Sequence, residues 1–227
     1  MSLFGDTWVI MPVYNEAAVV ASVVEHVRRT FPHVVCVDDG SSDGSAAQIT
    51  SAGAHLLRHP LNLGQGAALQ TGITYALRQP GIRYVVTLDS DGQHRPEDAA
   101  AMVEIARSGA ADVVLGSRFL NGGTEVPALK RAVLRSVAVL SPASRRMRLT
   151  DAHNGLRVLT ADAARQLRIT MGGMEHASEI VSLLAASKLR VVEAPVTILY
   201  TDYSKSKGQS LVNGINILFD LSIRQRG

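Results

Sequence analysis

The sequence predicts an α/β fold in which a mixed, mostly parallel sheet is flanked by helices. Short apolar, β-branched runs alternate with stretches of helical periodicity from the N-terminus to well past the middle of the chain. This order is typical of doubly wound sheets. The chain has 227 residues, 46% of them hydrophobic, which suffices for one well-filled domain, and no linker-like segment divides it. We therefore expect a single Rossmann-like domain over residues 1–227.

The strands expected in the first half are apolar runs that end in polar or glycine-containing turns. They are Trp8–Val13, Val34–Val37, Ala54–Leu57, Tyr84–Leu88 and Asp112–Leu115. The helices expected between them are Ala17–Arg29, Ser45–Ser51, Gly66–Leu77 and Pro96–Ser108. Proline favours the first turn of a helix, so Pro96 marks the start of the last of these.

The second half is less regular. The elements expected there are a helix around Leu129–Leu140, a strand near Leu156–Leu159, a helix Ala177–Ser187 and a strand Arg190–Tyr200. Because proline cannot donate a ladder hydrogen bond, Pro195 places the last strand at an edge or a bulge. The segment Leu211–Ile223 mixes apolar and polar residues at helical spacing. Such a helix packs on the core more often than it lies on a membrane surface.

Charge is unevenly distributed, although the net charge is only +3. The basic residues gather in two clusters: Lys130, Arg131, Arg135, Arg145, Arg146 and Arg148, and then Lys205, Lys207, Arg224 and Arg226. This asymmetry indicates an anionic partner. Nucleic acid is disfavoured, because almost no aromatic residues accompany the clusters to stack on bases. A phosphorylated lipid at a membrane surface fits better.

Cysteine usage and hydropathy point to the cytoplasm. The lone Cys36 lies inside an apolar run, so no disulfide framework is expected and a reducing compartment fits. The first residues do not have the pattern of a leader peptide, and no apolar stretch reaches membrane-spanning length. We expect a cytoplasmic protein, peripheral at the cytoplasmic face of a membrane.

The tripeptide Asp89-Ser90-Asp91 is the strongest indication of chemistry. It directly follows the buried strand Tyr84–Leu88 and is followed by Gly92-Gln93-His94. Ligands of open α/β sheets bind at the carboxyl ends of such strands. Two close carboxylates repel each other, and Mg²⁺ or Mn²⁺ commonly bridges a carboxylate to a diphosphate. The alternative is that Asp89 and Asp91 are turn or N-cap residues ahead of the helix at Pro96.

Four further polar segments end other strands, at the edge where Asp89 and Asp91 are expected. They are Met11-Pro12-Val13-Tyr14-Asn15-Glu16, Val37-Asp38-Asp39-Gly40-Ser41-Ser42-Asp43-Gly44-Ser45, Asn62-Leu63-Gly64-Gln65-Gly66 and Gly116-Ser117-Arg118. There is no Walker sequence, and Gly64-x-Gly66 lacks both a third glycine and a strand directly before it. A dinucleotide cofactor is therefore disfavoured.

Taken in order, these five motifs resemble those of family 2 glycosyltransferases, which have the GT-A fold. The resemblance covers almost the whole chain and is greatest to the polyprenyl-phosphate sugar synthases, the dolichyl-phosphate mannose synthase group. The motifs that point to this subgroup are Asp151-x-x-Asn154-Gly155-Leu156-Arg157, Glu193-x-Pro195-Val196 and Ser206-Lys207-Gly208.

The resemblance implies a role for each donor-side residue. The nucleotide-sugar would be bound by Pro12, Tyr14, Glu16, Val37, Asp39, Asp89, Ser90, Asp91, Gln93, Arg118 and Lys207. Asp39 would face the base, Asp89 would contact ribose or sugar, and Lys207 would reach the diphosphate. Asp91 and Gln93 would hold Mg²⁺ or Mn²⁺. An arginine that the family carries before this lysine is absent, since Tyr200-Thr201-Asp202 stands there.

The resemblance also implies where the acceptor binds. Arg131, Arg135 and Ser136 would hold a lipid phosphate from one helix. The alternative is a solvated basic helix face. The donor half would span about 1–118 and the acceptor half about 119–227. Asp89, Asp91, Arg131 and Lys207 would form the catalytic set.

These expectations favour one reaction, with two alternatives. A sugar passes with inversion from a GDP- or UDP-sugar to a polyprenyl phosphate, which is already anionic near neutral pH and needs no protein base. If the acceptor were instead a glycan hydroxyl, in polysaccharide or cell-envelope synthesis, Glu179 or Asp151 would be the base. The third alternative, a non-catalytic nucleotide-sugar-binding or membrane-docking subunit, is disfavoured by the intact Asp89-x-Asp91. A small membrane protein is a further candidate partner. His153 and His176 are expected to be loop residues that form hydrogen bonds.

Overall fold

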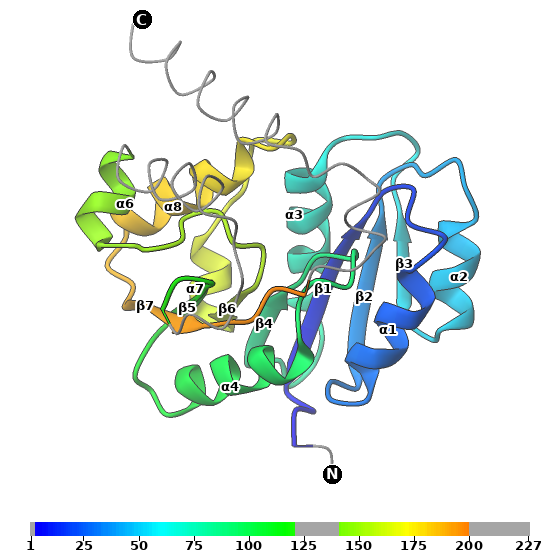
Figure 1. The fold of residues 1–227 in the computed structure, drawn as a ribbon. Coiled ribbons are helices and arrows are strands. Elements are labelled where there is room, and N and C mark those ends of the chain that lie inside the picture. The colour runs from blue at the N-terminus through cyan, green and yellow to red at the C-terminus, as the bar shows by residue number, and fades with distance from the viewer. Residues whose placement is uncertain (1–2, 121–140, 200–227) are drawn as a thin grey trace, which may run out of the picture.

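The computed structural model describes residues 3–120 and 141–199, which form a seven-stranded mixed sheet with helices on both faces (Figure 1). The strands are β1 (Thr7–Val13), β2 (His33–Asp38), β3 (His55–Arg58), β4 (Tyr84–Thr87), β5 (Val113–Ser117), β6 (Arg157–Thr160) and β7 (Val191–Pro195). The helices are α1 (Val20–Arg28), α2 (Ser45–Ser51), α3 (Gln65–Ala76), α4 (Pro96–Arg107), α6 (Pro142–Met147), α7 (Ala161–Gln166) and α8 (His176–Ala186).

The sheet order is β3-β2-β1-β4-β6-β5-β7, and β6 is the strand that runs against its neighbours. The pairs β1·β2, β1·β4, β2·β3 and β5·β7 are parallel. The first residue of β6, Arg157, pairs with Thr87 of β4 and Leu115 of β5, close to where those strands end. The chain that leads into β6 therefore reaches the same edge of the sheet as the Asp89 loop.

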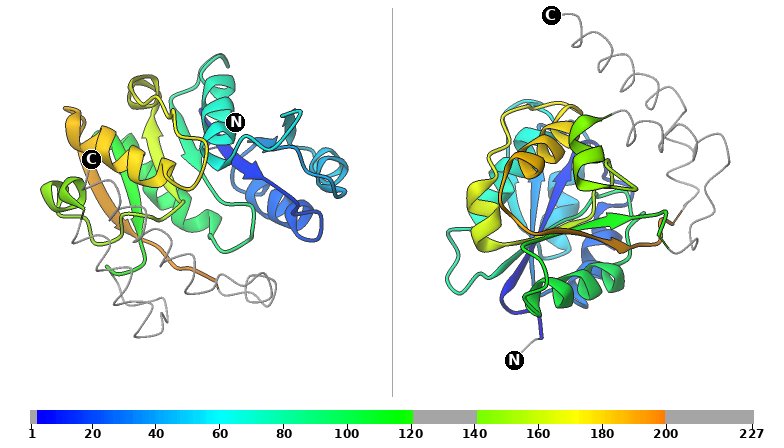
Figure 2. Two further views of the ribbon diagram at one scale, coloured as in Figure 1. Left: turned by 90° about the horizontal axis from the view of Figure 1, so that it is seen from above. Right: turned by 90° about the vertical axis from the view of Figure 1, so that its left-hand side faces the viewer.

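Alternating side chains of each strand divide the core into two layers. In β1, Val9 and Met11 pack with α1, α2 and α4 on one face, while Trp8 and Ile10 pack with α3, α7 and α8 on the other. Figure 2 shows helices on both sides of the sheet. Because strand side chains alternate with a period of two, buried runs such as Tyr84–Thr87 supply both layers.

The predicted order of strands and helices is confirmed over the described residues. The first helix starts at Val20 instead of Ala17, because the preceding residues bond to the loop after β2. The last strand ends at Pro195 and lies at the sheet edge, as the proline predicted. The short helices α6 and α7 were not predicted. The helices expected at Leu129–Leu140 and Leu211–Ile223 lie outside the described residues.

Within residues 3–120 and 141–199, no helix combines the length and the apolar character that a membrane span requires.

Gly72 is the closest point of contact between α3 and the sheet. A Cβ atom there would lie 2.3 Å from Ile10 Cγ2 in β1. We expect Gly72→Ala to lower the unfolding free energy by about 1–3 kcal/mol through overpacking. Urea denaturation measures the unfolding free energy of this variant. An increase of roughly 1 kcal/mol over wild type, which is what helix propensity alone would give, would contradict the packing argument. In an Ile10→Ala background the same substitution should cost less, because the clashing methyl group is absent.

Candidate active site

The loops after β1 and β2 are locked together by hydrogen bonds at the carboxyl edge of the sheet. Asn15, in the left-handed region with φ 54°, donates its N–H to Ser41 Oγ (2.9 Å) and accepts from the Ser42 N–H through Oδ1 (2.9 Å). The N–H of Glu16 donates to Ser45 Oγ at 2.9 Å. The N–H of Ala17 donates to Asp43 Oδ2 at 3.0 Å. The two predicted nucleoside-binding motifs therefore form one assembly.

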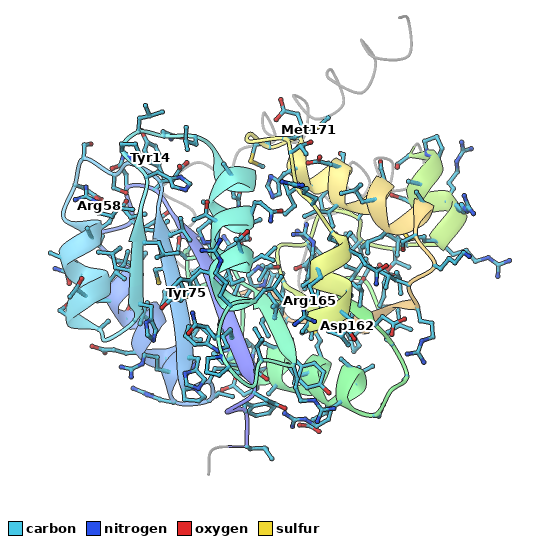
Figure 3. The ribbon with its side chains drawn as sticks, turned by 180° about the vertical axis from the view of Figure 1, so that it is seen from behind. Tyr14, Arg58, Tyr75, Asp162, Arg165 and Met171 are labelled. Atoms are coloured by element: carbon cyan, nitrogen blue, oxygen red, sulfur yellow. The ribbon has the colours of Figure 1, made fainter. Side chains whose placement is uncertain are left out.

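This assembly positions the residues predicted to hold the nucleoside. Pro12 and Val37 are register partners in adjacent strands and both are buried. Tyr14 is 48% exposed and lies at this edge of the sheet, as does Met171 (Figure 3). Asp39 is buried, and its carboxylate accepts from His59 Nδ1 (2.7 Å) and from the N–H groups of Leu63 (2.9 Å) and Gly64 (2.7 Å). Asp39 thus ties the loop before α3 to the end of β2.

Asp89 is held by groups from three elements. Its Oδ1 accepts from Gln65 Nε2 of α3 at 3.0 Å, and its Oδ2 lies 3.3 Å from His94 Nε2. Gly155, before β6, packs so closely that a Cβ there would lie 2.2 Å from Asp89 Oδ2. Thr87 Oγ1 donates to the Gly155 carbonyl at 2.8 Å, which holds the glycine in this place. About a third of the Asp89 side chain remains exposed.

Asp91 has a different environment from Asp89. Its Oδ1 accepts from the Gln93 N–H at 3.0 Å, and the residue is partly exposed, while Ser90 and Gln93 are buried. Burial and the charge of Asp89 raise the pKa of Asp91. Burial also acts to raise the pKa of Asp89, but the hydrogen bond and charge of His94, with the charge of Arg157, outweigh it and lower that pKa. Asp89 is therefore stabilised as an anion, whereas burial and the charge of Asp89 disfavour the ionised form of Asp91.

Arg118, just after β5, and Asp151, in the loop before β6, form a nearly buried ion pair. Arg118 Nε lies 2.6 Å from Asp151 Oδ2, and the Arg118 N–H donates to the same oxygen at 3.1 Å. Glu193 of β7 accepts from the N–H groups of Thr150 and Asp151, each at 2.9 Å. The two late motifs thus bond to each other, and Asp151 is already engaged by protein donors.

Glu179 of α8 holds the loop between α7 and α8. Its carboxylate accepts from the Thr170 N–H at 2.9 Å, from the Thr170 hydroxyl, and from the Met171 N–H at 2.9 Å. These bonds outweigh partial burial and lower the pKa of Glu179. The loop in turn contacts the start of α3, where the Gly66 N–H donates to the Gly172 carbonyl at 2.7 Å.

Sequence reasoning did not select Arg157, Gln65 or His176 as site residues. Arg157 is only 4% exposed and interacts electrostatically with Asp89 and Asp151. His176 is 3% exposed, and its Nδ1 lies 2.7 Å from the Gly173 carbonyl. Gln65 and Arg157 lie inside two motifs quoted above, so a signal existed, but nothing local indicates that both approach Asp89.

The described residues hold only part of the predicted site. Arg131, Arg135, Ser136 and Lys207 lie outside them. Within residues 3–120 and 141–199, no group of three or more His, Cys, Asp or Glu side chains is arranged to hold a metal.

Residues 8–164 match the family model described as Glycosyl transferase family 2. The chain belongs to this family. It is a glycosyltransferase with the GT-A fold, as the sequence motifs predicted. It is 26% identical to the UDP-N-acetylglucosamine–dolichyl-phosphate N-acetylglucosaminyltransferase of Methanococcus voltae, over 97% of this chain and 96% of that protein. It is 28% identical to the undecaprenyl-phosphate mannosyltransferase of Micrococcus luteus, over 90% of each chain.

Solved structures resemble the glycosyltransferase in fold. One is the glucosyl-3-phosphoglycerate synthase of Mycobacterium tuberculosis in complex with Mn²⁺, UDP and glucosyl-3-phosphoglycerate. The TM-score is 0.66 at 15% identity, over 94% of this chain and 78% of that one.

His153, in the loop before β6, gives stability a pH dependence. Burial, with the charge of Arg157, lowers its pKa from 6.5 to about 4. Between pH 6.5 and 4, His153 is protonated in the unfolded chain but neutral in the native state. Acidification over this range should therefore lower the unfolding free energy by up to about 3 kcal/mol. His153→Gln should flatten this part of a plot of unfolding free energy against pH, measured by urea denaturation. His26→Gln, at an exposed position, is the control, and an equal slope in both variants would contradict the assignment.

Proposed function

We propose that this glycosyltransferase transfers a sugar from a GDP- or UDP-sugar to a polyprenyl phosphate, with inversion and with Mg²⁺ or Mn²⁺. The observation that carries the proposal is the unequal pair at the end of β4. Asp89 is anchored by Gln65 and His94, whereas the pKa of Asp91 is raised by burial and by Asp89. Relatives whose names specify dolichyl or undecaprenyl phosphate support the acceptor.

The residues near Asp91 fit a hard divalent cation. The carboxylate of Asp91 and the amide oxygen of Gln93 are oxygen ligands, the type that Mg²⁺ and Mn²⁺ prefer. Mg²⁺ is usually held by one or two protein groups together with substrate phosphates, so a larger protein cluster is not required. A bound cation would supply charge neutralisation for the departing nucleoside diphosphate.

The protein's own groups support a phosphate acceptor over a glycan hydroxyl. A hydroxyl needs a base, and both candidates are engaged: Asp151 pairs with Arg118, and Glu179 holds the Thr170 loop. A phosphate monoester is already an anion near neutral pH. In the proposed step, one of its oxygens attacks the anomeric carbon as the bond from that carbon to the diphosphate oxygen breaks. A single displacement of this kind inverts the anomeric centre.

The remaining donor and acceptor contacts are part of the proposal. Pro12, Tyr14, Glu16, Val37, Asp39, Ser90, Arg118 and Lys207 would bind the nucleotide, and Arg131, Arg135 and Ser136 the lipid phosphate. This division gives a donor half over about 1–118 and an acceptor half over about 119–227. A lipid acceptor places the enzyme peripherally at the cytoplasmic face of a membrane, either directly or through a small membrane protein. The exposed Arg145, Arg146 and Arg148 would favour an anionic lipid surface.

Asp91→Asn tests the metal assignment. Wild-type enzyme should show a higher melting temperature with UDP or GDP plus Mn²⁺ than with the same nucleotide plus chelator, because a ligand that binds only the native state stabilises it. In Asp91→Asn this metal-dependent increment and sugar transfer should both be lost, while the melting temperature without ligand is kept. Asp162→Asn, at a highly exposed position on α7, is the matched control. Full activity of the Asp91 variant would contradict the assignment.

Arg131→Ala tests the acceptor assignment. Loss of a charge-assisted bond to a phosphate should raise the KM for polyprenyl phosphate by about tenfold or more. The Kd for the nucleotide should stay within about twofold, since donor contacts remain. Arg165→Ala, which removes an exposed arginine of α7, should change neither quantity. An unchanged KM in Arg131→Ala would argue for a glycan acceptor, which direct assays with polyprenyl phosphate and soluble glycans would then decide.

A further inference from the structure

We infer that Arg157, together with His176 and Gln65, forms the binding subsite for the transferred sugar, on the side of Asp89 that faces α3 and α8. The inference rests on the proposed function and deepens it. It starts from Arg157, a buried guanidinium for which the protein supplies no hydrogen-bond acceptor.

The position of the Arg157 side chain is typical of a ligand-binding residue and not of an arginine that stabilises the fold. It is 4% exposed, yet no oxygen atom of the protein accepts a hydrogen bond from its side chain over residues 3–120 and 141–199. A buried charge without hydrogen bonds is destabilising, and structural arginines avoid it by pairing, as Arg118 does with Asp151 at 2.6 Å. The five N–H groups of a guanidinium are all donors, so Arg157 is available to donate to the oxygen atoms of a ligand.

Strand register determines the side of Asp89 on which Arg157 lies. Arg157 alternates with Val158, which packs with α1, α2 and α4, so its side chain belongs to the layer of α3, α7 and α8. The charge of Arg157 acts on Asp89, and His94 lies within hydrogen-bond distance of its carboxylate. The charge of Asp89 in turn acts on Asp91. Arg157 thus acts on Asp89, whereas the metal and the diphosphate are proposed to lie at Asp91.

His176 adds a hydrogen-bond acceptor to the same cluster. The Gly173 carbonyl can only accept, so the Nδ1 atom, 2.7 Å away, carries the proton. Burial lowers the pKa of His176 and favours the neutral ring, which leaves a lone pair on Nε2. A Cβ at Gly66 would lie 2.7 Å from His176 Cβ, which places His176 beside Gly66, the residue that follows Gln65 at the start of α3.

The mixture of donors and acceptors identifies the ligand as hydroxyl groups. Phosphate oxygens only accept at neutral pH, so lone pairs of His176 and Asp89 would repel them. A sugar hydroxyl donates and accepts at once, and satisfies both Arg157 and the His176 or Asp89 lone pairs. The site nearest to Asp89 on this side therefore matches a hexose ring, and the diphosphate belongs on the Asp91 side.

The test separates sugar from diphosphate by comparing matched ligands. Titration calorimetry with Mn²⁺ would give Kd values for UDP, UDP-glucose, GDP and GDP-mannose, with wild type, Arg157→Met and His176→Leu. For a nucleotide that binds wild type, both variants should keep the diphosphate Kd within about twofold. The Kd of the matching nucleotide-sugar should rise about 10- to 100-fold for Arg157→Met, the usual effect of losing a charge-assisted hydrogen bond. Arg165→Met, on α7 and away from this edge (Figure 3), should leave all values unchanged.

Thermal unfolding supplies the second measurement. Arg157→Met removes no protein hydrogen bond, but it removes the buried charge that interacts with Asp89 and Asp151, so the variant should still fold with a melting temperature at or somewhat below that of wild type. If it does not fold, Arg157→Lys, which keeps the charge and loses the planar fork, takes its place with the same expected ratio of Kd values. Equal weakening of diphosphate and nucleotide-sugar would overturn the inference, because Arg157 would then serve the diphosphate. Unchanged binding of both would overturn it too, whereas a wild type that binds none of the four ligands would overturn the proposed function itself.

Discussion

The site depends on keeping one carboxylate ionised in a mostly enclosed position, that of Asp89. The low dielectric there would favour the neutral acid, so nearby donors must compensate. They come from α3 through Gln65, from the loop after β4 through His94, and from β6 through the charge of Arg157. These three elements therefore converge on one point, where the antiparallel strand β6 begins and where a Cβ at Gly155 would clash with Asp89.

The loops around this carboxylate are held together by hydrogen bonds within the protein. Asn15 and Ser41 join the first two loops, and Asp39 joins the second to the third. Glu193 of β7 accepts a hydrogen bond from the Thr150 N–H and so holds the chain that leads into β6. Groups held in place before the reaction need not reorganise as charge develops, which is the main way in which enzymes lower barriers of this kind. Rigidity near the donor is thus built from side-chain to backbone bonds.

The parts of the molecule that were predictable are those encoded by nearby residues. The buried strand predicted at Tyr84–Leu88, observed as Tyr84–Thr87, and the acidic pair after it follow from a short apolar run and from the residues that directly succeed it. Other contacts join residues that are far apart in sequence, such as Arg118 with Asp151 and Glu193 with Thr150. No local sequence pattern predicts these contacts. The same holds for α1, whose start shifts to Val20 because Ala17 bonds to Asp43. The role of Arg157 could not be predicted from local sequence either, because it depends on the approach of Asp89 from another loop.

The contacts at the start of α3 have a consequence for how the enzyme can bind anions. A helix N-terminus often binds phosphate, because its first N–H groups lack partners and its dipole is positive there. In this chain the Gly66 N–H is taken by the Gly172 carbonyl, and the carboxylate of Asp39 accepts from the Gly64 N–H just before the helix. Two of the N–H groups at the start of α3 are thus occupied within the protein, which reduces what this end of the helix can offer to an anion.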